Sequence, residues 1–379
     1  MVSSCKRLFG AFLCVKTTLP TIFVGGFLAA TAFLLIWDGR DAILISIKSR
    51  FFQSGPICMD GQPAKKITVG GDILLGRRNP VWRQIVQEGY DADAVLGDAA
   101  DLLRNSDAVF FNFEGILVSR EQTAREKDLP VRFSIGADPE ILTFLRSLNQ
   151  RIVLSFANNH SADFGIEAIE RTMEIIMRDS GVVFVGIGRN VIEATAPQII
   201  DFGTTRVAFL AFTDLLPDQY YATASRSGVA ALTEKNLHES IVRARKFADI
   251  VIVSLHTGVN PAKPFSVVPD AQQWRMAYGA IAHGADLVVG HQSHGLQMVE
   301  AYQGKMIWHS LGIFLYNPDA SEQYADSHPL HAAVEFYGGG LLRLSVCKEG
   351  ITAQDVIRTK MVRKDGHYQL VFVRKEEER

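Results

Sequence analysis

Two histidines, His291 and His294, follow a strongly apolar segment in the stretch "GADLVVGHQSHGLQ", residues 284–297. The run 287–289 is typical of a buried strand, and Gly290 gives the backbone conformational freedom just before His291. Imidazoles at such a spacing are either metal ligands or ordinary polar residues of a loop. This stretch alone does not decide between the two interpretations.

Four other apolar segments end in residues of the same kind. In open α/β sheets, ligands bind beyond the carboxyl ends of the strands, so we expect these side chains to meet at one edge. Oxygen and nitrogen donors without cysteine favour a borderline divalent ion such as Mn, Zn or Fe over an all-carboxylate site. Each signal is weak alone, because Asn also suits turns and Asp also caps helices. The strand ends are Asp72, Glu114, the triplet Asn158, Asn159 and His160, and His256.

The segments between these ends alternate between strand and helix patterns, which predicts an α/β domain. A helix is expected from residue 166 to Gly181, with Ile166, Ile169, Met173 and Ile176 on one face. After residue 305 strand-like segments follow one another with little helix, which predicts antiparallel strands in a second sheet of the same domain. The earlier strands are expected at 108–114, 151–160, 182–186, 206–212, 249–256 and 286–291.

Residues 19–37 contain no charge and are about as long as a helix that crosses a bilayer. The preceding basic residues favour a cytoplasmic N-terminus. A cleaved signal peptide is the rival, with "AATA" at 29–32 as an early cleavage site, but its apolar core is usually shorter. We therefore expect a single-pass cell-membrane protein with an extracytoplasmic C-terminal domain. Its parts are a cytoplasmic segment 1–18, an anchor 19–37, a connector 38–65 and a domain 66–373.

The composition of the chain limits the class of protein and its expected partners. The chain has 379 residues, of which 47% are hydrophobic and 21% charged, as in globular proteins. Its formal net charge of -2 gives no reason to expect a nucleic-acid partner. Cys58 and Cys347 would lie outside the cytoplasm, where a disulfide could form, but two unpaired thiols remain an alternative.

Six motifs occur in order between residues 66 and 317, and together they resemble the CapA/PgsA family of poly-γ-glutamate capsule biosynthesis proteins. The elements "ANNHxxDxG" and "GADLVxGHxxH" are the most specific. That family is similar in turn to calcineurin-like metallophosphoesterases, which implies a four-layer α-β-β-α sandwich with a two-metal site. The motifs are "GGDILLGR", "FNFEGILV", "FANNHSADFG", "SLHTG", "GADLVVGHQSHGLQ" and "HSLGIFLY".

The resemblance implies a role for each strand-end residue. One or two divalent ions would activate hydroxide, and His160 would protonate the leaving group. Arg77 and Asn158 are candidate substrate contacts. Leu74 stands where the similar enzymes have a histidine ligand, and Asn260 where the family has an acid. The implied metal ligands are Asp72, Glu114, Asn159, His256, His291 and His294.

Three functions are alternatives. The first is a membrane-anchored protein of capsule biosynthesis or export, of the poly-γ-glutamate type, working with other capsule-synthesis membrane subunits. The second is a metal-dependent phosphoesterase or envelope polymer hydrolase, whose substrate is an anionic polymer or a phosphoester. The third is a non-catalytic scaffold of the same fold. Loops 117–133 and 260–270 are candidates for holding the substrate.

Overall fold

The computed structural model describes residues 56–118, 134–178, 181–258, 268–319 and 338–373, together with the backbone of five N-terminal strands. The chain divides into two compact units, residues 1–63 and 64–379. In the first unit β1 pairs with β2, and β4 pairs with both β3 and β5, all antiparallel. These strands are β1 (Ser4–Leu8), β2 (Ala11–Val15), β3 (Phe23–Val24), β4 (Thr31–Asp38) and β5 (Asp41–Lys48).

In the described part of the chain, no helix combines the length and the apolar character that a membrane crossing requires. Within the predicted anchor 19–37, the structure describes only the backbone of β3 and most of β4. The remainder of that segment lies outside the described residues. The membrane anchor therefore stays a prediction.

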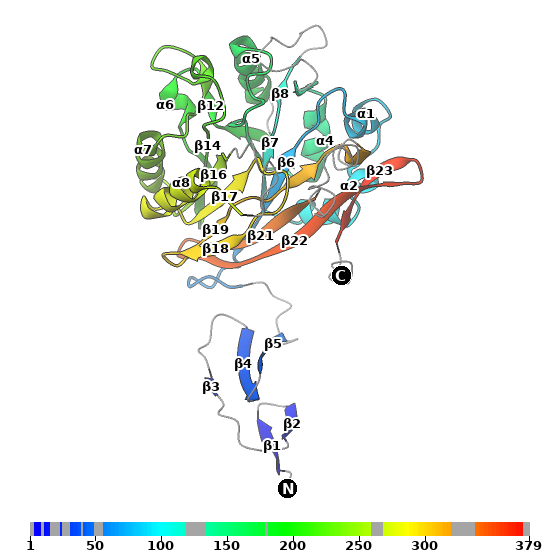
Figure 1. Ribbon diagram of the computed structural model, residues 1–379, viewed down its shortest axis with the longest axis vertical. Helices are drawn as coiled ribbons and strands as arrows, with labels where there is room; N and C mark the ends of the chain where they lie inside the picture. Colours follow the sequence, from blue (N-terminus) through cyan, green and yellow to red (C-terminus); the bar gives the residue numbers. More distant parts are fainter. Residues whose placement is uncertain are drawn as a thin grey trace. The chain divides into compact units, whose positions relative to one another are not determined.

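The second unit contains a large sheet with the strand order β11-β10-β7-β6-β21-β22-β23, in which β20 also pairs with β6. Figure 1 labels β6, β7, β21, β22 and β23 of this sheet. Neighbours among β6, β7, β10, β11 and β20 are parallel, and β21, β22 and β23 are antiparallel to their neighbours. The strands are β6 (Lys65–Ile73), β7 (Ala108–Phe113), β10 (Ile152–Ser155), β11 (Val182–Val185), β20 (Ile313–Leu315), β21 (Gly339–Cys347), β22 (Gly350–Lys364) and β23 (His367–Phe372).

A second sheet has the order β13-β14-β16-β17-β19-β18. Its four inner strands are parallel, and the outer strands β13 and β18 are antiparallel to their neighbours. The strands are β13 (Gln198–Asp201), β14 (Arg206–Thr213), β16 (Ile250–His256), β17 (Leu287–His291), β18 (Val299–Tyr302) and β19 (Lys305–Trp308).

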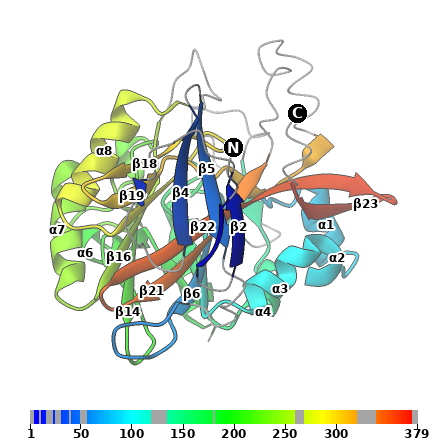
Figure 2. The same cartoon turned by 90° about the horizontal axis from the view of Figure 1, so that it is seen from below.

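The two sheets pack face to face. Phe110 of β7 stacks on Phe209 of β14 with ring centroids 5.5 Å apart, and both side chains are fully buried. Successive side chains of a strand point to opposite faces, so Ala208 and Leu210 point away from this contact. They join a second buried cluster with helices α7 (Glu234–Arg245) and α8 (Ala271–Ala282), which cover the outer face of this sheet (Figure 2).

Helices also lie on the outer side of the large sheet. The face predicted for the helix that begins at Ile166 is observed in α5, where Ile169, Met173 and Ile176 are buried. The unit therefore has the predicted α/β fold, with helices outside two packed sheets. These helices are α1 (Pro80–Val86), α2 (Ala92–Leu96), α3 (Asp98–Arg104), α4 (Ile141–Leu148) and α5 (Ile166–Met177). The remaining short elements are α6 (Val191–Ala194), η2 (Asp218–Tyr220), β8 (Ile116–Leu117), β9 (Gly136–Ala137), β12 (Ile187–Gly188) and β15 (Gly228–Val229).

One prediction for the strands after residue 305 is wrong. Strands β21, β22 and β23 pair antiparallel with one another as expected, but β19 and β20 pair parallel with earlier strands, and none of the five builds a separate sheet. Strand β21 pairs with β6 in the large sheet, and β19 pairs parallel with β17 in the other. Both pairings satisfy backbone groups that would otherwise stand unpaired at the edges of β6 and β17.

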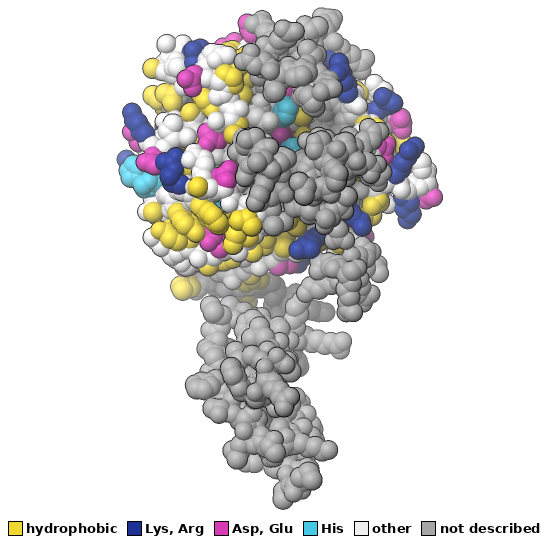
Figure 3. Space-filling view, in the orientation of Figure 1, with side chains coloured by type: hydrophobic (Ala, Val, Ile, Leu, Met, Phe, Trp, Pro, Cys, Tyr) yellow, Lys and Arg dark blue, Asp and Glu magenta, His cyan; other side chains and the backbone are white. Residues whose placement is uncertain are grey.

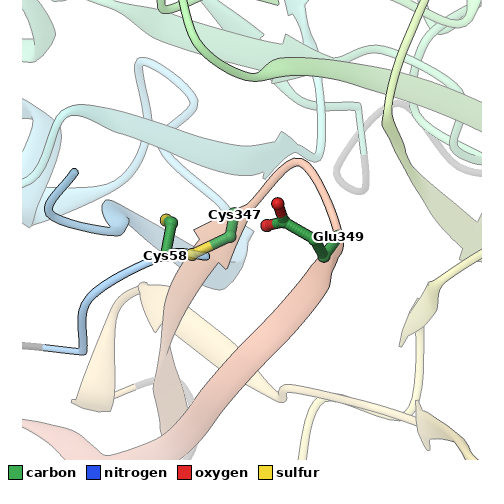
Figure 4. A group of neighbouring side chains, drawn as sticks. All are labelled: Cys58, Cys347 and Glu349. Carbon is green, nitrogen blue, oxygen red and sulfur yellow. The ribbon is translucent and has the colours of Figure 1, made fainter. Parts of the chain in front are cut away.

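The sequence left open whether the two cysteines are unpaired thiols or form a disulfide, and the structure favours the disulfide. Cys58 and Cys347 are both disulfide-bonded, and Figure 4 shows their side chains next to each other beside Glu349. The three side chains could be taken for a metal site, because their ligand atoms lie within 4.8 Å of one another. A disulfide sulfur is no thiolate, however, so this group lacks the ligands that a metal ion would need.

On the face drawn in Figure 3, basic and acidic side chains are interspersed among the described residues. This distribution agrees with the formal net charge of -2 of the whole chain.

Candidate metal centre

The ends of parallel strands from both sheets meet at one buried edge. Asp72 lies in β6, Glu114 follows β7, and His256 and His291 end β16 and β17 side by side in register. All four side chains are fully buried. The structure therefore brings together the strand-end residues that the sequence singled out, because parallel strands in layered sheets end on the same side.

Asp72 and His291 form the first pair of this centre. His291 Nδ1 lies 2.8 Å from Asp72 Oδ1, yet neither ring nitrogen of His291 makes a hydrogen bond. Burial raises the pKa of Asp72, but the nearby imidazoles, above all His291, outweigh burial and hold this pKa well below its usual range. An ionised carboxylate so close to an imidazole nitrogen that has no hydrogen-bond partner fits a shared cation.

Glu114 and His294 form the second pair. His294 Nε2 lies 3.3 Å from both carboxylate oxygens, but Glu114 Oε2 is buried without a hydrogen bond. Burial lowers the pKa of His294, but the carboxylates of Glu114 and Asp72 outweigh burial and raise it to about 9. Ligand atoms of Asp72, Glu114 and His294 all lie within 4.8 Å of one another. Since a buried polar atom without a partner is costly, a divalent ion would stabilise this group.

The loop that carries His294 has an unusual backbone. Gln292 and His294 have φ angles of 85° and 57°, a left-handed conformation that costs side-chain-bearing residues energy. The strand before the loop also approaches another segment closely, because a Cβ on Gly290 would lie 1.9 Å from the carbonyl oxygen of His309. Gly290 therefore permits the close packing, and the strained loop brings His294 to a carboxylate of the other sheet.

His160 lies beside this centre. Its Nε2 is 3.9 Å from Glu114 Oε1, and its Nδ1 is 2.8 Å from Asp163 Oδ2. Asp163 also accepts a hydrogen bond from the backbone N–H of Ile135, so the carboxylate is held in place. The interaction with Asp163 occupies Nδ1 and directs Nε2 toward the centre. Asp163 is the fixed Asp of the sequence element ANNHxxDxG, but the sequence alone assigned it no role.

Asn159 and His256 contact each other. His256 Nε2 lies 2.8 Å from Asn159 Oδ1 and 3.8 Å from Glu114 Oε1. Asn158 instead holds its loop against the end of β7, because its Nδ2 donates to the carbonyl of Phe113 and its Oδ1 accepts from the N–H of His160. Burial lowers the pKa of His256 despite the nearby carboxylates.

Asn112 is a second residue to which the sequence assigned no role, and it is fully buried in β7. Its Nδ2 lies 2.8 Å from Asp72 Oδ1 and 3.1 Å from His256 Nδ1. The available signal was a single polar residue inside the apolar run "AVFFNF".

Other residues that the sequence analysis considered lie away from the centre or outside the described residues. Arg77 donates to Asp138 Oδ1 and to the carbonyl of Val118, both at 2.6 Å, so these bonds direct it to another part of the fold. Leu74 packs against the main hydrophobic cluster. Asn260 and large parts of the two loops proposed to hold the substrate, residues 119–133 and 260–267, lie outside the described residues.

Comparison with known proteins gives a consistent assignment. Residues 66–318 match the family model described as "Bacterial capsule synthesis protein PGA_cap". The chain is 29% identical over 256 residues to the capsule biosynthesis protein CapA of Bacillus anthracis, covering 66% of this chain and 59% of that protein. It is 30% identical over 250 residues to the PGA biosynthesis protein CapA of Bacillus subtilis, covering 65% and 62%. The chain thus spans less than two thirds of the length of these relatives.

Among solved structures, the chain is similar to a hypothetical protein from Thermus thermophilus, with 10% identity and a TM-score of 0.43 over 77% of this chain and 98% of that one. It is also similar to a putative 5'-nucleotidase from Staphylococcus aureus, with 11% identity and a TM-score of 0.41 over 83% and 57%. Because the family model covers most of the second structural unit, the chain belongs to the bacterial capsule synthesis protein PGA_cap family.

Proposed function

We propose that this protein takes part in making or exporting an anionic capsule polymer of the poly-γ-glutamate type, and that it uses a divalent metal centre to do so. Family membership and the names of the two Bacillus relatives support the capsule role. The observation that carries the metal centre is the convergence of Asp72, Glu114 and His294, whose ligand atoms lie within 4.8 Å.

The donor set fits such an ion. His291 adds an imidazole with no hydrogen-bonded nitrogen, and Glu114 adds a buried oxygen without a hydrogen bond. Two carboxylates and two imidazoles suit Mn, Zn or Fe better than Mg or Ca. When bound, a divalent ion supplies Lewis acidity and makes a water molecule more acidic. Asp72, Glu114, His291 and His294 would hold it, with Asn159 and His256 adjacent.

Proton transfer in this proposal belongs to His160. Because Asp163 holds Nδ1, the atom of His160 that can give or take a proton is Nε2. That atom lies beside Glu114, at 3.9 Å, and can therefore protonate a leaving group at the centre. Hydrolysis of a phosphoester or of a bond in the polymer is the reaction that suits this arrangement.

We further propose that residues 19–37 anchor the protein in the cell membrane by a single span, with the C-terminal domain outside the cytoplasm. The nineteen uncharged residues support the anchor. The disulfide-bonded Cys58 and Cys347 support an oxidising compartment for the C-terminal domain. Other membrane subunits of capsule synthesis are the expected partners.

Metal analysis of the full-length protein in detergent tests the centre. We expect about one ion per chain, by the count of convergent donors, and its loss in the double variant His291→Ala with His294→Ala. The matched control is His238→Ala with His283→Ala, which removes two histidines that contact each other between α7 and the end of α8. Equal metal content in wild type and the His291 and His294 variant would refute the centre.

A substrate panel then tests the chemistry. Wild type loaded with Mn should hydrolyse a phosphodiester or γ-linked polyglutamate, and His160→Gln should lose this activity while it retains the metal. Full activity in His160→Gln would refute the role of His160.

A non-catalytic scaffold is the second candidate. The specific observation in its favour is Leu74, which packs on the core where the similar enzymes have a histidine ligand. Bound metal without hydrolysis of either substrate class would favour the scaffold.

A further inference from the structure

Asn112 joins the two sheets at the centre of the site. It belongs to β7 of the large sheet and is fully buried. Its Nδ2 lies 2.8 Å from Asp72 Oδ1 in the neighbouring strand and 3.1 Å from His256 Nδ1 in the other sheet. An amide nitrogen carries two hydrogens, which is the number that these two acceptors require.

The orientation of this amide is fixed by its surroundings. Exchanging its oxygen and nitrogen would place two acceptor oxygens 2.8 Å apart at Asp72, which is unfavourable. Asn158 Nδ2 donates to Asn112 Oδ1 at 3.4 Å, which also requires the oxygen on that side. Asp72 and Asn158 therefore select the same orientation of Asn112.

This orientation determines the tautomer of His256. If Nδ1 accepts from Asn112, the ring hydrogen of the neutral imidazole lies on Nε2. Nε2 in turn lies 2.8 Å from Asn159 Oδ1, an acceptor that needs a hydrogen. Both contacts of His256 therefore agree on one tautomer.

We infer that Asn112 is a positioning residue that holds Asp72 and His256 in register and fixes His256 with its hydrogen on Nε2. His256 then presents an N–H group to Asn159 and orients this side chain beside the metal centre. The expected effect of Asn112 on metal affinity rests on the proposed metal centre. The tautomer of His256 does not depend on a metal. Orienting partners of this kind typically change metal affinity about 10–100-fold.

Two variants and two controls test this. Asn112→Ala removes both donated bonds, and Asn112→Asp replaces the donor with acceptor oxygens at nearly the same size. Asn149→Ala and Asn149→Asp are the matched controls. Asn149 is also buried, and its Nδ2 also donates twice, to the carbonyls of Leu103 and Ser106, but it contacts no residue of the site.

Two measurements are made on each full-length protein. The first is the dissociation constant for Mn or Zn, which should rise at least about tenfold in both Asn112 variants and less than about twofold in the controls. The second is the pair of ring 15N chemical shifts of His256 in metal-free protein labelled with 15N-histidine, assigned by comparison with His256→Gln. Wild type should show the Nε2–H pattern, and Asn112→Asp should move the hydrogen to Nδ1.

The two readouts separate this inference from the proposed function. If wild type binds no metal, the metal centre fails, and the 15N shifts alone decide about Asn112. An Nδ1–H pattern for His256 in wild type, or a pattern unchanged by Asn112→Asp, would overturn the inference. Unchanged metal affinity in both Asn112 variants would overturn it as well.

Discussion

The contact between His294 and Glu114 makes the stability of the metal-free protein depend on pH. The carboxylates of the site outweigh the effect of burial and raise the pKa of His294 from 6.5 to about 9. At 1.36 kcal/mol per pH unit, this rise corresponds to about 3 kcal/mol. The His294 side chain is 25% exposed, so screening by water reduces the contribution to about 2 kcal/mol.

The direction of this pH dependence is set by proton linkage. A histidine whose pKa is higher in the folded state binds more protons there than in the unfolded chain. The stabilisation is therefore fully present below pH 6.5 and is lost as the pH rises through about 9. Urea unfolding of the metal-free protein, in chelator, should show this loss between those two pH values.

Glu114→Gln should remove most of this pH dependence, because it removes the nearest negative charge from His294. Asp93→Asn is the control, since Asp93 is exposed and pairs with Arg104 instead. If Glu114→Gln keeps the same fall in unfolding free energy between pH 6.5 and 9 as wild type, the ion pair is not the cause and the reasoning fails.

The same proton competes with metal. An imidazole must lose its proton before it binds an ion, so metal affinity should rise with pH up to about 9. For one displaced proton, the apparent dissociation constant should fall about 100-fold between pH 6.5 and 8.5. Calorimetric titration with Mn at these two pH values measures this change. An affinity that is equal at both would refute the assignment of His294 as a ligand.

Three further outcomes are expected. Phe209→Ala should cost about 3–5 kcal/mol of unfolding free energy, because the ring is buried against Phe110, and an unchanged urea midpoint would contradict this. Gln292→Gly should stabilise the metal-free protein by about 1 kcal/mol, because it relieves a φ of 85°. The contrary result is a lower urea midpoint. His238→Gln should reduce the loss of stability below pH 6.5, because burial and His238 lower the pKa of His283, and unchanged acid sensitivity would count against it.

The strand ends were predictable from the sequence, because the apolar run that indicates a buried strand also shows where the strand ends. His256 and His291 each end a largely apolar run, and both runs are buried strands in the structure. The division of parallel strands between two sheets was not predictable in this way, since apolar runs look the same in either sheet. For the same reason the placement of β21 beside β6 required the structure.

The contact partners of individual side chains were harder to predict from the sequence. Arg77 follows the β6 strand end in sequence and was a plausible anion contact, but it pairs with Asp138, sixty-one residues later. Asn112 reads as an interruption in a core strand, and its importance depends on His256, 144 residues away. Such contacts arise from tertiary packing, and local patterns do not encode them.

The spacing of the two histidines shows how local geometry adapts the site. Between the two histidines, Ser293 is buried and its hydroxyl donates to the carbonyl of Gly295 within the loop. The left-handed backbone at His294 directs the imidazole of His294 toward Glu114. His291 at the end of β17 faces Asp72, and His294 in the following loop faces Glu114, so one strand end places an imidazole at each carboxylate.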